Sequence, residues 1–333
     1  MTQSNSTLWY ARSPVPTPLG IALRLGWLET SYCALGLEIK SALSTGVTSK
    51  EALFDHRVIN SIRQGGSIPA LHARASGKKM KILGLTWTDE FQAIIALPHS
   101  GIKDISDLVG RRVGIYAQAN SKGQFSPHVA VALRGITNTL SIAKLGLEHI
   151  EITSLYKEGG KDTPYQVEAR ALTEKKVDAI FVKGAQGAEL MFSLGAEPLM
   201  DIGSHPDKRL RSNNATPRTL TVDTHLLEQQ PYVIHHLLDL MERTADWAEE
   251  NPGEAYKLIA QEVGTTVDWV KFAYPKAYKQ LRLGLFEDEL EHLQNFSDFL
   301  YEQDFIPRPV NVMASVDHKP LNSFRYQGLQ RIY

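Results

Sequence analysis

Two segments constrain the fold of this chain more than any others. Residues 101–117 read GIKDISDLVGRRVGIYA, which predicts a short acidic helix, a stop at Gly110, a basic pair and then a strand. Residues 175–182 read KKVDAIFV, which predicts the end of a helix followed by an apolar strand. In open α/β sheets, ligands bind beyond the carboxyl ends of such strands. The two segments therefore predict where a binding cleft lies.

Helices and strands alternate along the first two thirds of the chain, which is typical of parallel βαβ units. Residues 62–76 are predicted as a helix, and from His225 onward amphipathic helices follow one another. The predicted fold is α/β with a helical C-terminal region. Strands are expected at residues 8–11, 37–42, 80–86, 92–97, 112–117, 150–155, 178–182 and 198–202.

Length and composition bound the class of protein. A chain of 333 residues suggests about two domains. The formal net charge of -1 gives no reason to expect nucleic acid as a partner. One cysteine, Cys33, excludes an internal disulfide, and no H-E-x-x-H or Cys/His spacing supports a metal site. We expect no cofactor.

The sequence also gives expectations for membrane insertion and for cellular location. No apolar run approaches the roughly 20 residues that span a bilayer. The first residues, MTQSNSTLWYARS, lack the basic and apolar regions of a secretory signal. This predicts a cytoplasmic location for the chain as it stands, and a periplasmic one if a signal peptide preceded it and was removed.

The segments IKDISDLVGRRVGI, VDAIF and LLEQQPYVIHHLLDLMERTADWAEENPGEAYKLIA together resemble the type II periplasmic solute-binding family, in the branch that binds nitrate, sulfonates and taurine. The resemblance implies two lobes: residues 1–95 plus 218–333, and residues 96–217. It further implies hinge closure over a small organic anion in the cleft between the lobes. Where such a chain serves a transporter, an ABC-type permease is its partner.

A closer likeness is to the sulfinate desulfinases that share this fold. Residues 63–69 (RQGGSIP) and 13–16 (SPVP) are similar to their motifs, and Arg63 matches the arginine of these enzymes. Ser13, however, stands where they carry the nucleophilic cysteine. Their catalytic histidine aligns to Leu53, although His56 follows three residues later. These departures weaken the case for desulfinase chemistry.

Arg63 is the strongest candidate for ligand binding. Its guanidinium is a rigid fork of donors that matches carboxylate, sulfonate or sulfinate oxygens. Gly65 and Gly66 would let backbone N–H groups approach an anion. Ser13 precedes a predicted helix, so its hydroxyl could cap that helix or touch the ligand.

Other candidates follow the predicted strands. Lys183 and Gln186 come after the VDAIFV strand and suggest a polar ligand, for example one with a second acidic group, although a solvated lysine at a helix start is equally typical. Trp87 is interpreted as either a wall of the cleft or a core residue. The further predicted ligand-binding residues are Thr86, Gln118, Asn120 and Ser121.

We favour a non-enzymatic solute-binding protein for a small organic anion. The alternative is an enzyme on the same scaffold, desulfinase-like or hydrolytic, that uses Ser13 and His56. A serine nucleophile would need a base within hydrogen-bond reach, and no G-x-S-x-G elbow occurs. A cytoplasmic ligand sensor is a third hypothesis.

Overall fold

A computed structural model describes residues 7–42, 58–117, 126–157 and 163–330. The chain forms two compact units, each with one five-stranded sheet. Unit 1 comprises Met1–Thr88, Asn214–Gly264 and Lys276–Tyr333. Unit 2 comprises Asp89–Asn213 and Thr265–Pro275. The predicted class, a mixed α/β type II periplasmic-binding-protein-like fold, is confirmed.

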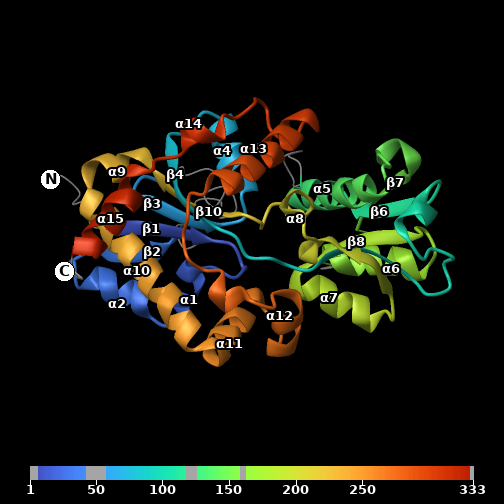
Figure 1. The fold of residues 1–333 in the computed structure, drawn as a ribbon, viewed down its shortest axis with the longest axis horizontal. Helices are drawn as coiled ribbons and strands as arrows, with labels where there is room; N and C mark the ends of the chain where they lie inside the picture. The colour runs from blue at the N-terminus through green and yellow to red at the C-terminus, as the bar shows by residue number, and fades with distance from the viewer. Residues whose placement is uncertain (1–6, 43–57, 118–125, 158–162, 331–333) are drawn as a thin grey trace. The chain divides into compact units, whose positions relative to one another are not determined.

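The sheet of unit 1 has the strand order β2-β1-β3-β10-β4. Strands β1, β2 and β3 are mutually parallel, whereas β10 runs antiparallel to both β3 and β4. Figure 1 shows α1, α2 and α10 on one side of this sheet and α4, α13 and α14 on the other. The elements up to β4 are β1 Thr7–Arg12, α1 Pro18–Arg24, α2 Trp27–Cys33, β2 Glu38–Ser41, β3 Ser61–Gly65, α4 Ile68–Ala75 and β4 Met80–Thr86.

The remaining elements of unit 1 come from the C-terminal part of the chain. They are β10 Arg218–Asp223, α9 Thr224–Gln229, α10 Pro231–Glu250, α11 Pro252–Val263, η5 Ala277–Lys279, α13 Glu287–Glu302, α14 Val312–Ser315 and α15 Lys319–Gln330. Because β10 lies between β3 and β4, unit 1 cannot complete its sheet until the chain has passed through unit 2.

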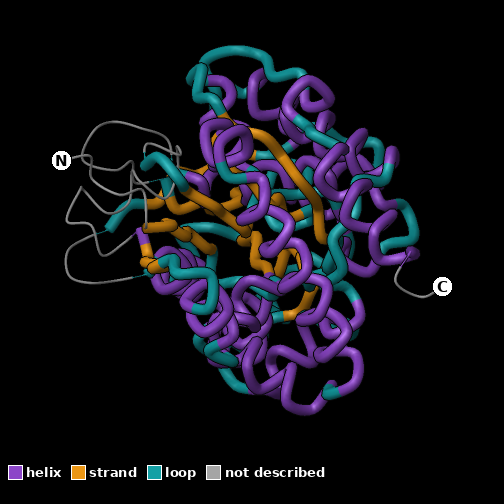
Figure 2. Tube along the Cα trace, turned by 90° about the vertical axis from the view of Figure 1, so that its left-hand side faces the viewer, coloured by secondary structure: helices purple, strands orange, loops and turns teal. Residues whose placement is uncertain are grey.

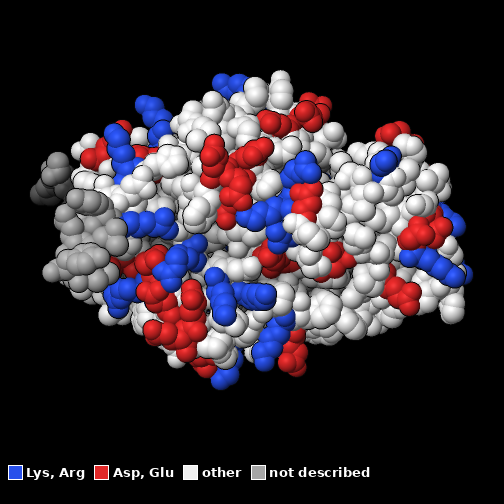
Figure 3. Space-filling view, viewed as in Figure 1, with Lys and Arg blue, Asp and Glu red and all other residues white. Residues whose placement is uncertain are grey.

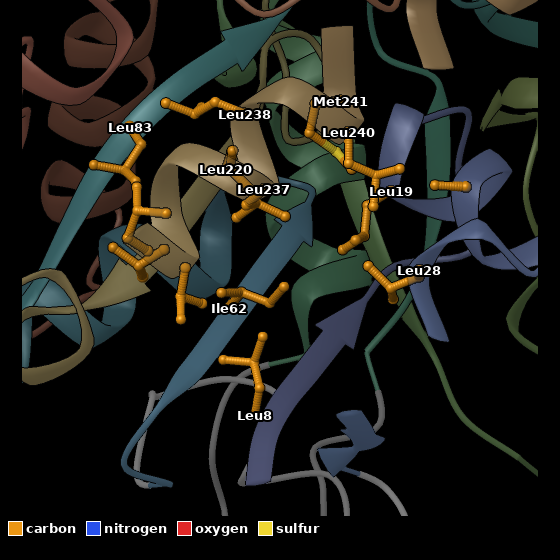
Figure 4. Packing of buried hydrophobic residues seen from close by; sticks show 14 of the residues in the cluster. Leu8, Leu19, Leu28, Ile62, Leu83, Leu220, Leu237, Leu238, Leu240 and Met241 are labelled. Carbon is orange, nitrogen blue, oxygen red and sulfur yellow. The ribbon is translucent and has the colours of Figure 1, made fainter. Parts of the chain in front are cut away.

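The core of unit 1 lies between its sheet and the long helix α10. Apolar residues at three- and four-residue spacing give α10 one buried face, which includes Leu237 and Met241. This face packs on Ile62 of β3 and Leu220 of β10 (Figure 4). Leu19 of α1 is fully buried in the same cluster. Each such side chain contributes about 1.5–3 kcal/mol by leaving water.

The sheet of unit 2 has the strand order β7-β6-β8-β5-β9. Strands β6, β7 and β8 are parallel, and β5 runs antiparallel to β8 and β9. The elements are β5 Gln92–Ala96, η2 Ile105–Leu108, β6 Arg112–Tyr116, α5 Pro127–Ile142, η3 Leu147–His149, β7 Glu151–Leu155, α6 Pro164–Thr173, β8 Ala179–Lys183, α7 Gly184–Ser193, β9 Glu197–Asp201, η4 Ile202–Ser204, α8 Lys208–Arg211 and α12 Val267–Ala273.

The two segments that most constrain the predicted fold contribute neighbouring strands of this sheet. Val113 of β6 pairs with Ala179 of β8. Just before that pair, the Arg112 guanidinium donates to both carboxylate oxygens of Asp178, at 2.8 and 3.1 Å. The Arg112 backbone N–H donates to the same carboxylate at 2.9 Å. Arg112 and Asp178 therefore tie together the starts of the two parallel strands.

Several segments differ from the sequence-based expectations, among them residues 214–217, which were expected in the second lobe and fall in unit 1. Residues 62–76, predicted as one helix, form the end of β3 and then α4, so Arg63 lies on a strand. Residues 89–95 fall in unit 2 because β5 pairs with β8 and β9. Residues 265–275 also fall in unit 2, where the Phe91 N–H donates to the Ala273 carbonyl at 2.8 Å.

Helices flank the strands on their outer sides in Figure 2. On the face shown in Figure 3, Lys and Arg side chains lie among Asp and Glu, in keeping with the near-zero net charge. Among the described residues, no helix is both long enough and apolar enough to cross a membrane.

Candidate functional site

Arg63 forms the centre of the candidate site in unit 1. Its Nη1 donates to the Gly66 carbonyl at 3.0 Å, and its Nη2 donates to Ser13 Oγ at 3.2 Å. The residue is only 4% exposed. Burial lowers the pKa of Arg63 to about 10, so the side chain still carries its charge at neutral pH. Ser13, Arg63 and Gly66, which the sequence predicts as ligand-binding residues, are thus joined by direct contacts.

Gly65 makes this arrangement possible because no larger residue fits. Its φ of +153° lies in a region that side chains other than glycine rarely adopt. A Cβ at this position would lie 2.6 Å from the Cβ of Ser13 and would also overlap the Ser13 hydroxyl. The Ser13 N–H in turn donates to the Gln64 carbonyl at 3.1 Å. The loop after β1 is therefore seated directly on the end of β3.

Asn214 is a structural part of the site that the sequence analysis did not identify. Its Oδ1 accepts the Ile68 N–H at 2.8 Å, and its carbonyl accepts the Ser67 N–H at 2.6 Å. These amides begin helix α4, whose N-cap Ser67 makes no side-chain capping bond. Asn214 therefore caps α4 from a distant part of the chain. A Cβ on Gly66 would lie 2.7 Å from Asn214 Oδ1, so Gly66 is needed for this contact.

Further polar side chains gather at the same edge of the sheet. Because β10 is antiparallel to its neighbours, its first residues lie beside the last residues of β3 and β4: Thr219 pairs with Gly65, and Arg218 with Thr86. Gln64 Nε2, Thr86 Oγ1 and Thr219 Oγ1 are buried without a hydrogen-bond partner among the described residues. Buried polar atoms are rarely left without a hydrogen-bond partner, and a polar ligand could provide one.

Trp87 and Thr86 follow each other at the end of β4 but lie in different surroundings. The Trp87 ring is half-buried and packs against His292 of α13, with ring centroids 5.5 Å apart. Thr86 is fully buried at the sheet edge described above. Of the two predicted residues Thr86 and Trp87, it is therefore Thr86 that lies at the sheet edge that carries Arg63 and Gly65.

The predicted residues Lys183 and Gln186 lie in unit 2. Lys183 Nζ forms an ion pair with Glu90, whose side chain is 0% exposed, while the lysine side chain is 18% exposed. The backbone of Lys183 is held by Tyr165, whose hydroxyl accepts from the Lys183 N–H at 2.9 Å and donates to its carbonyl at 3.2 Å. Gln186 is exposed on α7. Glu90 and Tyr165 were not identified from the sequence.

Four predicted residues lie outside the described part of the chain: His56, Gln118, Asn120 and Ser121. Within the described residues, no group of three or more His, Cys, Asp and Glu side chains could hold a metal ion. The polar groups of the candidate site are a buried guanidinium, hydroxyls and amides. Such groups suit the recognition of an oxyanion.

The chain is similar to known proteins over most of its length. A family described as NMT1/THI5 like matches residues 60–132, a stretch that includes Arg63. The 2'-hydroxybiphenyl-2-sulfinate desulfinase of Rhodococcus erythropolis is 27% identical over 341 residues, covering 91% of this chain and 89% of the enzyme. The predicted likeness to sulfinate desulfinases is therefore confirmed.

Solved structures confirm the fold. The desulfurization enzyme DSZB superposes with a TM-score of 0.77 at 23% identity, covering 97% of this chain and 100% of that one. The periplasmic aliphatic sulphonate binding protein SsuA from Escherichia coli gives a TM-score of 0.71 at 17% identity, covering 95% and 93%. The predicted resemblance to the type II periplasmic-binding fold is thus confirmed.

Proposed function

We propose that this protein binds a small organic anion, and that Arg63 holds the acid group. The observation that carries the proposal is the burial of the Arg63 guanidinium at the carboxyl edge of a sheet, next to the Ser13 hydroxyl. Burial disfavours the charged form of arginine, and an oxyanion bound nearby would offset that cost. The expected ligands are sulfonates, sulfinates and carboxylates.

The surroundings of Arg63 support recognition of several oxygens. Thr219 and Thr86 would add hydroxyls, and Gln64 an amide, from neighbouring strands of the same sheet edge. Charge-assisted hydrogen bonds from such donors are each worth about 1.5–3 kcal/mol. The relatives are consistent with this chemistry, because the two named ligand classes are an aliphatic sulfonate and a sulfinate.

A thermal-shift screen tests the ligand class. Methanesulfonate, taurine, benzenesulfonate, benzenesulfinate and benzoate would each be added to the wild-type protein. A ligand present at 100 times its Kd adds about 2.7 kcal/mol to the stability of the folded state. We expect at least one sulfonate or sulfinate to raise the melting temperature. The absence of a shift with every member of this panel would contradict the proposal.

A second candidate function is desulfination or hydrolysis with Ser13 and His56. The 27% identity to the desulfinase over 91% of this chain favours it. Against it, a serine replaces a thiol at the nucleophile position, and serine is a much weaker nucleophile without an adjacent base. Turnover of an aryl sulfinate that is lost in Ser13→Ala would establish this function. If the chain serves a transporter instead, an ABC-type permease would be its partner.

A further inference from the structure

Unit 1 has a cavity at the end of its sheet opposite to the Arg63 site. Its volume is about 370 Å³, which lies within the range of roughly 300–1,000 Å³ that is usual for small-molecule pockets. It is lined by residues of β4, α9 and α10 and by the start of α15, all within unit 1. In Figure 1, α9 and α15 lie side by side at this end of the unit. The proposed function gives this cavity no role.

The strand pairing shows how far the cavity lies from the Arg63 site. Because β10 is antiparallel to β4, Arg218 pairs with Thr86 at the edge that carries Arg63, whereas Val222 pairs with Lys81 beside the cavity. The backbone of β4 advances about 3.3 Å per residue, so Lys81 and Thr86 are separated by roughly 16 Å. A small ligand in the cavity would therefore not reach Arg63.

One side of the cavity is apolar. Leu227 of α9 and Ile234 of α10 line it, together with Pro231 and Pro320. Ile234 is almost fully buried and belongs to the core of unit 1, and Leu227 packs against the same cluster. Because the core holds these side chains in place, the apolar surface is formed before any ligand binds. It suits a branched aliphatic or aromatic group.

Two opposite charges that line the cavity are each held by the backbone. Lys81 Nζ donates to the Ala314 carbonyl at 3.0 Å, which leaves two of its three N–H donors. The Asp317 N–H donates to the Ile82 carbonyl at 3.0 Å, and Asp317 Oδ1 accepts the Lys319 N–H at 3.0 Å. Among the described residues, neither Lys81 nor Asp317 forms an ion pair. Each half-buried group is thus fixed in place and can still bind a charged group of a ligand.

The remaining acid and lysine of the cavity lie at its rim. Glu228 and Lys319 are exposed, so water and salt screen their charges more than those of Lys81 and Asp317. The cavity therefore presents one fixed charge of each sign beside an apolar surface. Such a surface is complementary to a ligand that carries both charges and an apolar group.

We propose that this cavity binds a zwitterionic α-amino acid with an apolar side chain. Lys81 binds the carboxylate, Asp317 binds the ammonium group, and the side chain packs on Leu227 and Ile234. An organic anion without an ammonium group would meet the like charge of Asp317 and is therefore disfavoured. The ligand and the site both differ from those of the proposed function, so this inference does not depend on it.

Binding is tested by NMR titration of protein labelled with ¹³C in its isoleucine methyl groups. Ile234 reports on the cavity because it lines it. L-leucine is added at about pH 8, where an ordinary histidine is neutral, so that His235 adds no cation to the cavity. We expect the Ile234 methyl resonance to shift and saturate. The absence of a saturable shift up to about 10 mM leucine, ten times a weak Kd of about 1 mM, would overturn the proposal.

Three leucine analogues test the parts of the ligand separately. 4-Methylpentanoate lacks the ammonium group, 3-methylbutylamine lacks the carboxylate, and glycine lacks the apolar side chain. Each should bind at least about tenfold more weakly than leucine, because it loses a charge-assisted hydrogen bond or the apolar contact. If 4-methylpentanoate or the amine bound as tightly as leucine, the role given to Asp317 or to Lys81, respectively, would be wrong.

Two conservative variants test the protein side. Lys81→Gln keeps a donor for the Ala314 carbonyl, and Asp317→Asn keeps an acceptor for the Lys319 N–H, so each removes a charge without removing its backbone contact. Both should weaken leucine binding at least about tenfold. Lys79→Gln is the matched control, because Lys79 is exposed and does not line the cavity. Circular dichroism checks folding, and wild-type affinity in both folded variants would overturn the proposal.

Titrations of Arg63→Lys separate this inference from the proposed function. We expect leucine to shift the Ile234 resonance equally in the wild type and in Arg63→Lys. If the leucine response were lost in Arg63→Lys, leucine would bind at Arg63 and the cavity site would be wrong. Leucine binding at Ile234 in a protein that binds no sulfonate, sulfinate or carboxylate would support the cavity site and contradict the proposed function alone.

Discussion

Replacing Gly65 by alanine should destabilise unit 1 and disturb the Arg63 site together. Two costs arise. The backbone would hold an alanine at φ = +153°, and the new Cβ would lie 2.6 Å from the Ser13 Cβ. Because Ser13 accepts a hydrogen bond from Arg63, the displacement of Ser13 also alters the guanidinium's surroundings.

The magnitude follows from these two terms. A non-glycine residue in a sparsely populated backbone region costs about 1–3 kcal/mol. Forcing an additional carbon into a filled space costs about 1–3 kcal/mol more. We therefore expect Gly65→Ala to lower the free energy of unfolding by roughly 2–6 kcal/mol, the sum of these ranges.

Urea denaturation measures this loss through the midpoint and the slope of the transition. Gly264→Ala is the matched control, because Gly264 has a φ of +78° but nothing within 4 Å of its would-be Cβ. It should lower the free energy of unfolding by about 1–2 kcal/mol, the cost of the left-handed backbone alone. Adding Ser13→Gly to Gly65→Ala removes the clashing atoms and should recover part of the loss. A loss in Gly65→Ala no greater than in Gly264→Ala would refute the steric reasoning.

Three further predictions concern stability and are read from the same denaturation curves. Asn214→Ala should cost about 1 kcal/mol, as expected for the loss of a helix cap, and no loss at all would contradict the capping role. Asp178→Asn should cost roughly 1 kcal/mol at pH 7 once solvent screening is allowed for. Hydrogen bonds from Arg112 lower the pKa of Asp178. The extra stability of the wild type over Asp178→Asn is therefore present above the ordinary carboxyl pKa and should disappear as the pH falls through the lowered value. A stability difference that persisted at pH 2 would be inconsistent with this cause. Gly135→Ala would place a Cβ 2.8 Å from Cε1 of Phe181 and still closer to other ring atoms, so it should cost about 1–3 kcal/mol or more, and a neutral effect would show that the ring can move aside.

The sequence was sufficient for the class of fold because its strongest signals are local. The segments around Arg112 and Asp178 each combine a helix end, a charged turn and an apolar strand, and these patterns are typical of βαβ units. Their pairing as neighbouring strands confirms that interpretation. Strand β3 was missed because all five of its residues are buried, which removes the alternation that identifies a half-exposed strand.

The candidate site was only partly accessible from the sequence, for a different reason. Arg63, Gly65 and Gly66 are adjacent in the chain, so their common location could be predicted. Asn214 bonds Ile68 across 146 positions, and no local pattern reports such a contact. For the same reason, the sequence could not predict which unit contains residues 265–275. The apolar face of a short amphipathic helix does not identify the element that it packs against.

Calorimetric titration of Arg63→Lys tests the central claim most directly. The best sulfonate or sulfinate from the thermal-shift screen would be titrated into the wild type, into Arg63→Lys and into Arg74→Lys. Arg74 is a suitable control because its guanidinium bonds Ser315 and the Lys78 carbonyl in the same unit. Lysine keeps the charge but loses the planar fork. We predict an affinity at least about tenfold weaker in Arg63→Lys and unchanged in Arg74→Lys. Wild-type affinity in a folded Arg63→Lys protein would contradict the account.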